Sequence, residues 1–126
     1  MTIETFLKDV PGKGLGVFSV NKVKKGETVW VYESDFCKTF SSDEVKKMPP
    51  VQQAYINKYA YRTHDEPDIW ELDLDNGRFM NHSENPNTDY TDMKGWAVRD
   101  IEAGEEITCD YRSFDISAID FVTLER

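Results

Sequence analysis

The chain has 126 residues, a length typical of one domain with one hydrophobic core. Its formal net charge of −9 at pH 7 argues against DNA or RNA as a partner, because neutralising phosphates requires a basic surface. An acidic surface instead favours a basic partner such as a Lys/Arg-rich protein tail, although the same charge would also keep a small protein soluble.

The two cysteines, Cys37 and Cys109, lie far apart in the sequence and in no zinc-binding spacing. A reduced compartment is a simpler interpretation of them than a disulfide. The N-terminus carries no basic-then-apolar signal, and no apolar run reaches membrane-spanning length. The sequence therefore predicts a soluble intracellular protein without a metal site, in the cytoplasm, or in the nucleus if the source is eukaryotic or the protein is delivered to a host.

Short strands and frequent turns dominate the expected elements in the first half of the chain. Alternating glycines precede one strand, and β-forming residues after a Lys-Lys-Gly-Glu turn indicate another. A serine cap and a proline pair delimit a short helix, and a further segment fits helix or strand, with a short helix running into a strand favoured. These elements are strands at 17–20 and 28–32 around a turn at 24–27, a helix from the N-cap Ser42 to Pro49-Pro50, and the ambiguous segment 52–61.

The second half adds turns, two more strands and a terminal helix. An Asp-Asn-Gly sequence indicates a hairpin-type turn, and the last apolar residues recur at helical spacing. In chain order the elements are a polar turn at 64–68, a weakly alternating segment at 69–74, the hairpin turn at 75–77, strands at 96–98 and 107–111 around a turn at 102–104, and a helix at 115–124. Together these elements predict a mostly β fold with short helices, in a single domain over residues 1–126.

The densest polar cluster is the segment 78–87, Arg-Phe-Met-Asn-His-Ser-Glu-Asn-Pro-Asn. A buried Asn-His pair destabilises a fold unless the protein or a ligand supplies its hydrogen bonds. Two further motifs are Gly-Lys-Gly-Leu-Gly-Val-Phe at 12–18 and Gly-Glu-Glu-Ile-Thr-Cys-Asp-Tyr at 104–111. In this order the three motifs resemble the signature of the SET domain, the protein-lysine methyltransferase fold. The segment 26–32 also resembles the strand that ends in an active-site tyrosine in that family.

This resemblance, which covers residues 12–111, implies a SET-type β-clip fold of small curved sheets with a C-terminal pseudoknot. The pseudoknot would bring Asn81, His82 and Tyr111 together. The implied cofactor is S-adenosyl-L-methionine, and the implied acceptor is a lysine side chain on a basic protein, such as a histone or histone-like protein. No direct contact with nucleic acid or membrane is expected, and a homodimer could complete the substrate groove.

The residues that the resemblance assigns to the cofactor come from three parts of the chain. Glycines let the backbone approach a ligand closely, and an Asn side chain offers a donor and an acceptor to the methionine moiety. The His82 ring fits a satisfied core histidine as well as a ligand contact. Arg78 would pair with the cofactor carboxylate or, slightly favoured, with an internal acid such as Asp110. The implied set is Lys13, Gly14, Leu15, Gly16, Arg78, Asn81, His82, Tyr111 and Phe114.

Tyr111 is the first choice for catalysis, and Tyr32 is expected to flank the same lysine channel. Methyl transfer requires a neutral amine, so the pKa of the lysine, about 10.4 in water, must fall through desolvation and a nearby sulfonium. A tyrosine hydroxyl and backbone carbonyls can then orient the amine within about 3–3.5 Å of the methyl group. Cys109 is the third channel residue, and its small size, where the family often has Phe or Tyr, predicts that more than one methyl group can be added.

The chain departs from many family members because no cysteine follows Asn-His-Ser and no zinc cluster follows the catalytic tyrosine. The segment 112–126 is the expected lid, in which Phe114 or Phe121 would cover the adenine, although a helix that only packs on the sheet fits equally. Two rival functions are a non-catalytic SET-fold module that binds a basic peptide and a methyltransferase for a non-protein amine. The intact set of site residues favours a protein-lysine methyltransferase.

Other members of the polar segments have structural interpretations. Phe79 and Met80 are expected in the core, and Asn85-Pro86-Asn87 is expected to form a turn whose Asn side chains stabilise bends. The acidic residues around Pro67 superficially resemble metal ligands. A solvated turn, which could form a rim that receives a basic substrate, is the favoured interpretation.

Overall fold

The computed structural model describes residues 1–116. The predicted terminal helix at 115–124, including Phe121, therefore falls almost wholly outside the described residues. The strands are β1 Thr5–Val10, β2 Gly14–Ser19, β3 Thr28–Val31, β4 Cys37–Ser41, β5 Ile69–Asp73, β6 Asn81–His82, β7 Thr88–Thr91, β8 Lys94–Ala97 and β9 Glu106–Cys109. The helices are α1 Ser42–Lys46 and α2 Pro50–Tyr59, with short 3-10 helices η1 Ser34–Phe36, η2 Asn76–Phe79 and η3 Tyr111–Ser113.

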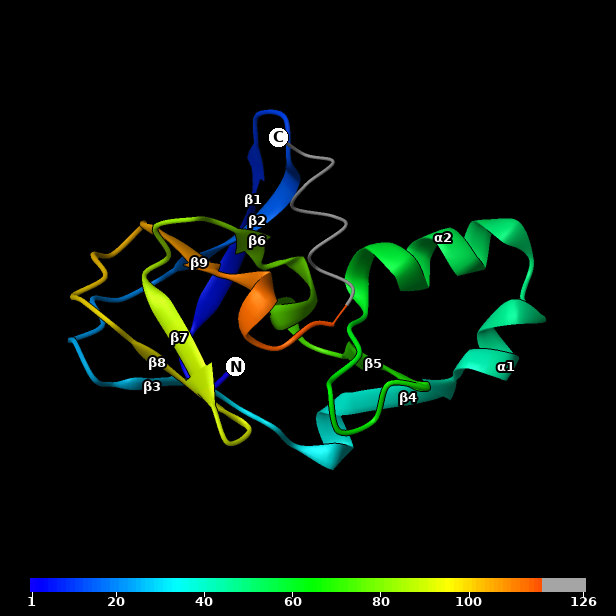
Figure 1. The fold of residues 1–126 in the computed structure, drawn as a ribbon. Coiled ribbons are helices and arrows are strands. Elements are labelled where there is room, and N and C mark those ends of the chain that lie inside the picture. Colours follow the sequence, from blue (N-terminus) through cyan, green and yellow to red (C-terminus); the bar gives the residue numbers. More distant parts are fainter. Residues whose placement is uncertain (117–126) are drawn as a thin grey trace.

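Three small sheets carry the fold, with strand orders β1-β2-β9-β6, β3-β8-β7 and β4-β5. The short strand β6 runs parallel to β9, with Asn81 opposite Thr108 and His82 opposite Cys109. The other neighbouring strands of these sheets pair antiparallel. Helices α1 and α2 group with β4 and β5 on one side of the molecule (Figure 1). The prediction of a mostly β fold with short helices is confirmed.

The glycine-rich segment closes the hairpin between β1 and β2. Gly12 and Gly14 have φ values of +78° and +87°, in the left-handed region that a side chain disfavours. Phe6 of β1 stacks on Phe18 of β2 across the hairpin, with 5.6 Å between ring centroids. The apolar run at 17–20 predicted β2. Strand β1 was not predicted, because charged residues interrupt its apolar ones.

The predicted cap of the first helix is wrong by one residue. Ser41, not Ser42, caps α1, and its hydroxyl accepts a hydrogen bond from the Glu44 amide at 3.1 Å. The Glu44 carboxylate accepts one in return from the Ser41 amide, which completes a capping box. Pro50 begins α2 rather than ending α1, because the first turn of a helix leaves its amides unpaired in any case.

The predicted hairpin turn at 75–77 is also wrong. The Asp75 side chain accepts a hydrogen bond from the Gly77 amide at 2.9 Å and caps η2, which leads the chain from β5 to β6. The last predicted strand ends early as well, at Cys109 rather than at Tyr111. The Asp110 side chain accepts from the Arg112 amide and begins η3, so local capping ends the strand.

Two clusters of buried apolar side chains form the core. Met80 belongs to the larger cluster and Phe79 packs against it, as predicted. The smaller cluster joins the helices to β5, which contributes Trp70 and Leu72. Since side chains alternate along a strand, Glu71 and Asp73 lie on the opposite face of β5.

Candidate active site

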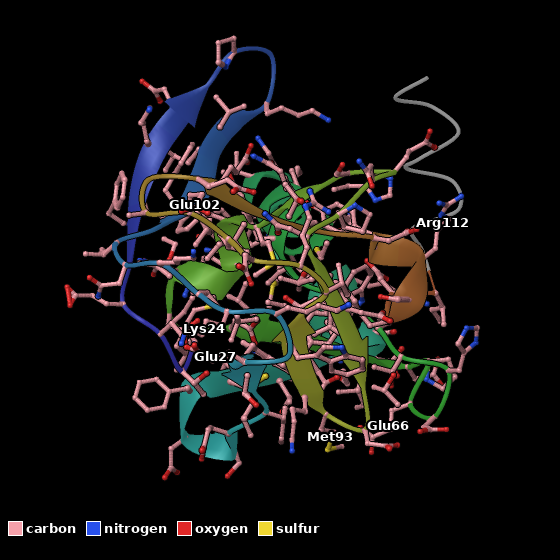
Figure 2. The ribbon with its side chains drawn as sticks, turned by 90° about the vertical axis from the view of Figure 1, so that its left-hand side faces the viewer. Lys24, Glu27, Glu66, Met93, Glu102 and Arg112 are labelled. Atoms are coloured by element: carbon pink, nitrogen blue, oxygen red, sulfur yellow. The ribbon has the colours of Figure 1, made fainter. Side chains whose placement is uncertain are left out.

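A pocket of about 730 Å³ is lined by residues from all three sheets and from the loop after α2. Sites that enclose cofactors and other small ligands commonly measure roughly 300–1,000 Å³. Glu66 and Met93, which both line the pocket, are seen along the lower edge of Figure 2. The predicted site residues that line this pocket are Tyr32, Arg78, Cys109, Tyr111 and Phe114.

Tyr111 is held in the pocket from both its main chain and its side chain. Its hydroxyl donates to the Met80 carbonyl oxygen at 2.6 Å, and its amide donates to His82 Nδ1 at 3.1 Å. Burial raises the pKa of Tyr111 above its ordinary value. Near neutral pH the side chain is therefore an uncharged hydroxyl that can accept a hydrogen bond on its oxygen but cannot serve as a strong base.

Aromatic rings form a continuous wall around Tyr111. Phe114 meets Tyr61, Tyr90 and Tyr111 edge to face, with centroid separations of 5.4, 5.5 and 6.2 Å. Such contacts contribute about 0.5–1.5 kcal/mol each beyond the area they bury, so Phe114 is firmly placed. Tyr61 and Tyr90 were missed from the sequence, because neither lies in a motif. Aromatic faces attract cations, which suits the wall to an ammonium or sulfonium group.

A second cluster of predicted site residues gathers on β9. Asn81 Nδ2 donates to the Leu15 carbonyl oxygen at 3.2 Å and to Glu106 Oε2 at 2.9 Å. A β-carbon at Gly16 would lie 2.6 Å from the same Glu106 oxygen, so only glycine leaves room for this carboxylate. Glu106 was missed from the sequence, where Gly-Glu-Glu indicated only a turn. Of the described residues that line the pocket, none comes from 13–16 or 81–82, so the predicted site falls into two parts.

The predicted pair between Arg78 and Asp110 is wrong. Arg78 Nε donates to the Asp73 carbonyl oxygen at 2.9 Å, and its Nη1 donates to the Tyr55 hydroxyl at 2.7 Å. Asp110 instead accepts two hydrogen bonds from the Arg112 guanidinium, at 2.9 and 2.7 Å, which hold the pKa of Asp110 below its ordinary value. A role for Arg78 at the cofactor carboxylate stays a prediction.

The His82 ring links β6 to the chain that follows β9. Because the Tyr111 amide donates to Nδ1, that nitrogen acts as an acceptor and carries no proton. The rings of His82 and Tyr111 lie 5.3 Å apart, and Nδ1 lies 3.7 Å from an Asp110 carboxylate oxygen. These contacts give the ring an anchoring place in the fold, and its contact with a ligand stays a prediction.

The Asn87 side chain is hydrogen-bonded to the backbone of β9. The predicted turn at 85–87 did not include this role. Asn87 is 1% exposed, and its Nδ2 donates to the Glu106 carbonyl oxygen at 2.7 Å and to Glu105 Oε2 at 3.0 Å. Its Oδ1 accepts from the Thr108 amide at 2.9 Å. Asn87 and strand β6 therefore hold β9 at two places, as the expected pseudoknot requires.

The sequence pattern of the SET domain family matches residues 14–112. The chain belongs to the SET-domain family. The match covers the cluster on β9 and all of the pocket lining except Ser113, Phe114 and Asp115, which lie just beyond it. It confirms the family resemblance seen in the three motifs.

Solved structures share the SET fold of this chain. Polycomb Repressive Complex 2 of Chaetomium thermophilum, autoinhibited and bound to S-adenosylmethionine, has a TM-score of 0.68 and 22% identity, over 100% of this chain and 17% of that one. A humanized mutant of that complex bound to the inhibitor GSK126 has a TM-score of 0.66 and 23% identity, over 90% of this chain and 16% of that one. A Plasmodium falciparum protein described as a candidate histone methyltransferase has a TM-score of 0.58 and 24% identity, over 88% of this chain and 95% of that one. The chain thus spans less than a fifth of the Polycomb chains.

This SET domain shows no metal centre or membrane span in the part that the structure describes. Within residues 1–116, no group of three or more His, Cys, Asp or Glu side chains could hold a metal ion. No described helix is long and apolar enough to cross a bilayer. Cys37 and Cys109 are both free thiols, so the disulfide alternative is not formed.

Strand β5 of the SET domain presents two carboxyl groups to the pocket, Glu71 and Asp73. Burial raises the pKa of Asp73 from 3.8 to about 7, and the nearby Asp75 carboxylate adds to the shift. Burial also raises the pKa of Glu71, with a further contribution from Glu66. Neither residue was predicted, because the weak alternation at 69–74 does not reveal which face of the strand is buried.

Replacing Asp73 by asparagine should stabilise the protein at about pH 8 and change little at about pH 4. The pKa of Asp73 is about 7 in the folded protein and 3.8 in the unfolded chain. Between pH 3.8 and about 7, Asp73 therefore binds more protons in the folded state than in the unfolded state. Its favourable contribution is therefore complete below about pH 4 and is lost as the pH rises through 7. The difference corresponds to at most about 4 kcal/mol.

Thermal unfolding of the wild type and the Asp73→Asn variant across this pH range measures the effect. The exposed Asp9, replaced by asparagine, is the matched control because it changes the net charge equally. A stability difference between Asp73→Asn and wild type that stays constant with pH would contradict the prediction.

Proposed function

We propose that this chain is an S-adenosyl-L-methionine-dependent protein-lysine N-methyltransferase that acts on a basic protein, such as a histone or histone-like protein. The observation that carries the proposal is the Tyr111 hydroxyl, bound to the Met80 carbonyl oxygen in an aromatic-lined pocket of a SET domain. SET domains are typical of S-adenosylmethionine-dependent lysine methyltransferases, and one structural neighbour is bound to that cofactor.

The residues of this chain fit S-adenosylmethionine. A pocket of about 730 Å³ with aromatic and carboxylate walls suits a cofactor that carries a sulfonium cation. Outside this pocket, a β-carbon at Gly14 would have no atom within 4 Å, so a ligand such as the methionine moiety could approach the backbone there. When bound, the cofactor supplies an electrophilic methyl group. The residues proposed to hold it are Lys13, Gly14, Leu15, Gly16, Arg78, Asn81, His82, Tyr111 and Phe114.

The chain's own task is to deliver a neutral, oriented amine. Desolvation by the aromatic wall around Phe114 lowers the pKa of a bound lysine and so favours loss of its proton. The Tyr111 oxygen, whose own proton is donated to Met80, can accept a hydrogen bond from the amine. Orientation of this kind can supply up to about 7–11 kcal/mol of the barrier. Tyr32, which also lines the pocket, is proposed to flank the incoming lysine.

Cys109 bears on how many methyl groups the lysine receives. It lines the pocket and is 1% exposed, with its Sγ 3.9 Å from the Asn81 carbonyl oxygen. A cysteine is smaller than the Phe or Tyr often found there in the family and cannot anchor a water as tyrosine does. We therefore expect dimethyl or trimethyl product in mass spectra of the methylated substrate, and monomethyl product alone would contradict this.

The function is tested by transfer of labelled methyl groups from S-adenosylmethionine to a mixture of core histones and other basic proteins. Mass spectrometry of the labelled proteins then names the protein and the lysine. Transfer to protein lysines, with none to an acidic protein, supports the proposal. Equal transfer to free lysine would favour an amine methyltransferase, and tight peptide binding without transfer would favour a non-catalytic module.

A further inference from the structure

Glu71 is a largely buried residue that lines the pocket, and no cation of the described residues lies beside its carboxyl group. Its residue is 9% exposed, and it is the one acidic residue classed as buried in the described part of the chain. Its main chain is paired with Tyr61 in both directions, at 2.8 and 2.9 Å. Among residues 1–116, however, none gives its carboxyl group a hydrogen bond or an ion pair. Its oxygens are not among the described buried atoms that lack a partner, so they face the open pocket, where a cation or donor can reach them. Partial burial makes the charged form costly and favours binding of such a partner.

The side chain points into the pocket rather than into the core. Trp70 and Leu72, its neighbours on β5, are buried in the smaller core cluster, and the alternation of the strand turns Glu71 the other way. Asp73 projects from the same face and lines the same pocket. The two carboxyl groups therefore form an anionic wall, separated along β5 by about 6.6 Å of backbone.

The cations that line the pocket are engaged elsewhere or lie beyond ion-pair distance of this wall. Arg78 binds the Tyr55 hydroxyl and the Asp73 carbonyl oxygen, and the Lys58 ammonium lies 5.3 Å from the centre of the Tyr59 ring. No lysine or arginine among the described residues lies within 4.0 Å of either wall carboxylate. Burial raises the pKa of Asp73 and the N-terminal ammonium and Arg78 act to lower it, whereas no cation of the described residues contributes to the pKa of Glu71. Glu71 is therefore the carboxyl group of the wall that is left for a cation from outside.

We propose that Glu71 is a specificity-determining residue that binds a cationic side chain of the substrate, with Asp73 as a second acceptor on the same wall. The inference rests on the proposed function, and it names the residue that would distinguish cationic substrates from neutral ones. The cation could be the ammonium of the target lysine before it loses its proton, or the charge of a basic residue beside that lysine. Both sources share the same chemistry, a charge-assisted hydrogen bond to a carboxylate.

The position of Tyr32 supports this assignment. Tyr32 and Glu71 line the same pocket. Burial raises the pKa of Tyr32, and Cys37 and then Glu71 add to the shift. Acidic residues of the loop after α2, Asp65 and Glu66, line the same pocket. A basic peptide would therefore meet negative charge at the loop and again at the wall, which favours its approach over that of neutral or acidic peptides.

Peptide binding by the full chain tests the inference independently of methyl transfer. One fluorescent peptide carries a single lysine among neutral residues, and a second carries the same lysine flanked by arginines. Glu71→Gln keeps the size of the side chain and removes its charge, and it should weaken binding by about 10–100-fold. Glu4→Gln is the control, because Glu4 is exposed, does not line the pocket and changes the net charge equally.

The two peptides separate the two sources of the cation. Weaker binding of both peptides identifies the target lysine, and weaker binding of the arginine peptide alone identifies a flanking residue. Equal affinities of Glu71→Gln and wild type, an equal loss in Glu4→Gln, or no binding of either peptide by wild type would overturn the inference. Glu71→Asp, which withdraws the carboxylate by one methylene, should weaken binding less than Glu71→Gln and provides a second variant.

The same variants keep this inference distinct from the proposed function. A wild-type protein that binds the peptides through Glu71 but transfers no methyl group supports the cation site and refutes the enzyme. If wild type and Glu71→Gln both methylate the lysine peptide and have the same KM for it, the result supports the enzyme and refutes the cation site.

Discussion

Replacing Tyr111 by phenylalanine should lower the rate of methyl transfer by about 10²–10³-fold, the loss typical of removing one preorganised polar group from an active site. The hydroxyl is fixed by the Met80 carbonyl oxygen at 2.6 Å, so its oxygen is held in one place in the pocket. The ring contact with Phe114 and the amide bond to His82 do not use the hydroxyl and should survive. The loss should therefore appear in kcat while the fold persists.

Single-turnover rates with labelled S-adenosylmethionine and a saturating basic substrate measure this effect. Tyr90→Phe is the matched control, because the Tyr90 hydroxyl lies in the same pocket and donates to the Met80 sulfur at 3.0 Å. We expect the control to slow transfer by less than about tenfold, because it removes one weak hydrogen bond. Comparable rate losses in the two variants would contradict the prediction that the Tyr111 hydroxyl contributes more to methyl transfer than the Tyr90 hydroxyl.

The stability of Tyr111→Phe should change only modestly. The variant leaves the Met80 carbonyl oxygen without its donor from Tyr111, which costs about 1–3 kcal/mol in a buried site. A small domain with a stability of about 5–15 kcal/mol remains folded after that loss. Thermal unfolding of the variant would separate a catalytic defect from a folding defect, because a folding defect large enough to abolish activity would bring the melting temperature down to the assay temperature.

The parts of the fold predicted best from the sequence are those whose signals are local. Strands β2 and β3 follow runs of β-forming residues, and their glycine turns have the positive φ values that glycine favours. The motif at 78–87 also predicted correctly that Asn81 and His82 would lie beside the last strand. That prediction came from the family resemblance, since nothing local in the sequence joins residues so far apart.

The site residues that were missed depend on contacts made far along the chain. Glu71 and Asp73 become pocket residues because Trp70 and Leu72 pack against the helices, which the weak alternation at 69–74 does not reveal. Similarly, Arg78 was expected to meet Asp110, yet it is satisfied by nearer partners on α2 and β5. Side-chain pairing is set by three-dimensional proximity, so charge and motif alone did not predict it.

Asn87 shows the same limit with a larger energetic consequence. An Asn-Pro-Asn sequence indicates a turn, and local rules assign the Asn side chain to its own bend. In the structure this side chain reaches β9, about twenty residues later, where it satisfies one carbonyl and one amide of the strand backbone. Burial at 1% exposure means that no water replaces these bonds.

Replacing Asn87 by alanine should therefore lower the free energy of unfolding by about 3–5 kcal/mol, because it leaves the Glu106 carbonyl and the Thr108 amide unsatisfied in the core. Such a loss is a large fraction of the stability of a small domain. Chemical denaturation of wild type and variant measures it. Asn85→Ala is the matched control, because Asn85 belongs to the same turn and is exposed, so its effect should stay within about 0.5 kcal/mol.

Hydrogen exchange can show where the stability is lost. If Asn87 holds β9 in place, exchange of the Thr108 amide should accelerate more in Asn87→Ala than exchange in the β4-β5 sheet, which belongs to the other core cluster. Because Tyr111 follows β9 directly, loosening that strand should also weaken the Met80–Tyr111 contact and slow methyl transfer. A variant with wild-type stability and a protected Thr108 amide would show that β2 and β6 hold the strand without Asn87, and that Asn87 is not needed to align the tyrosine.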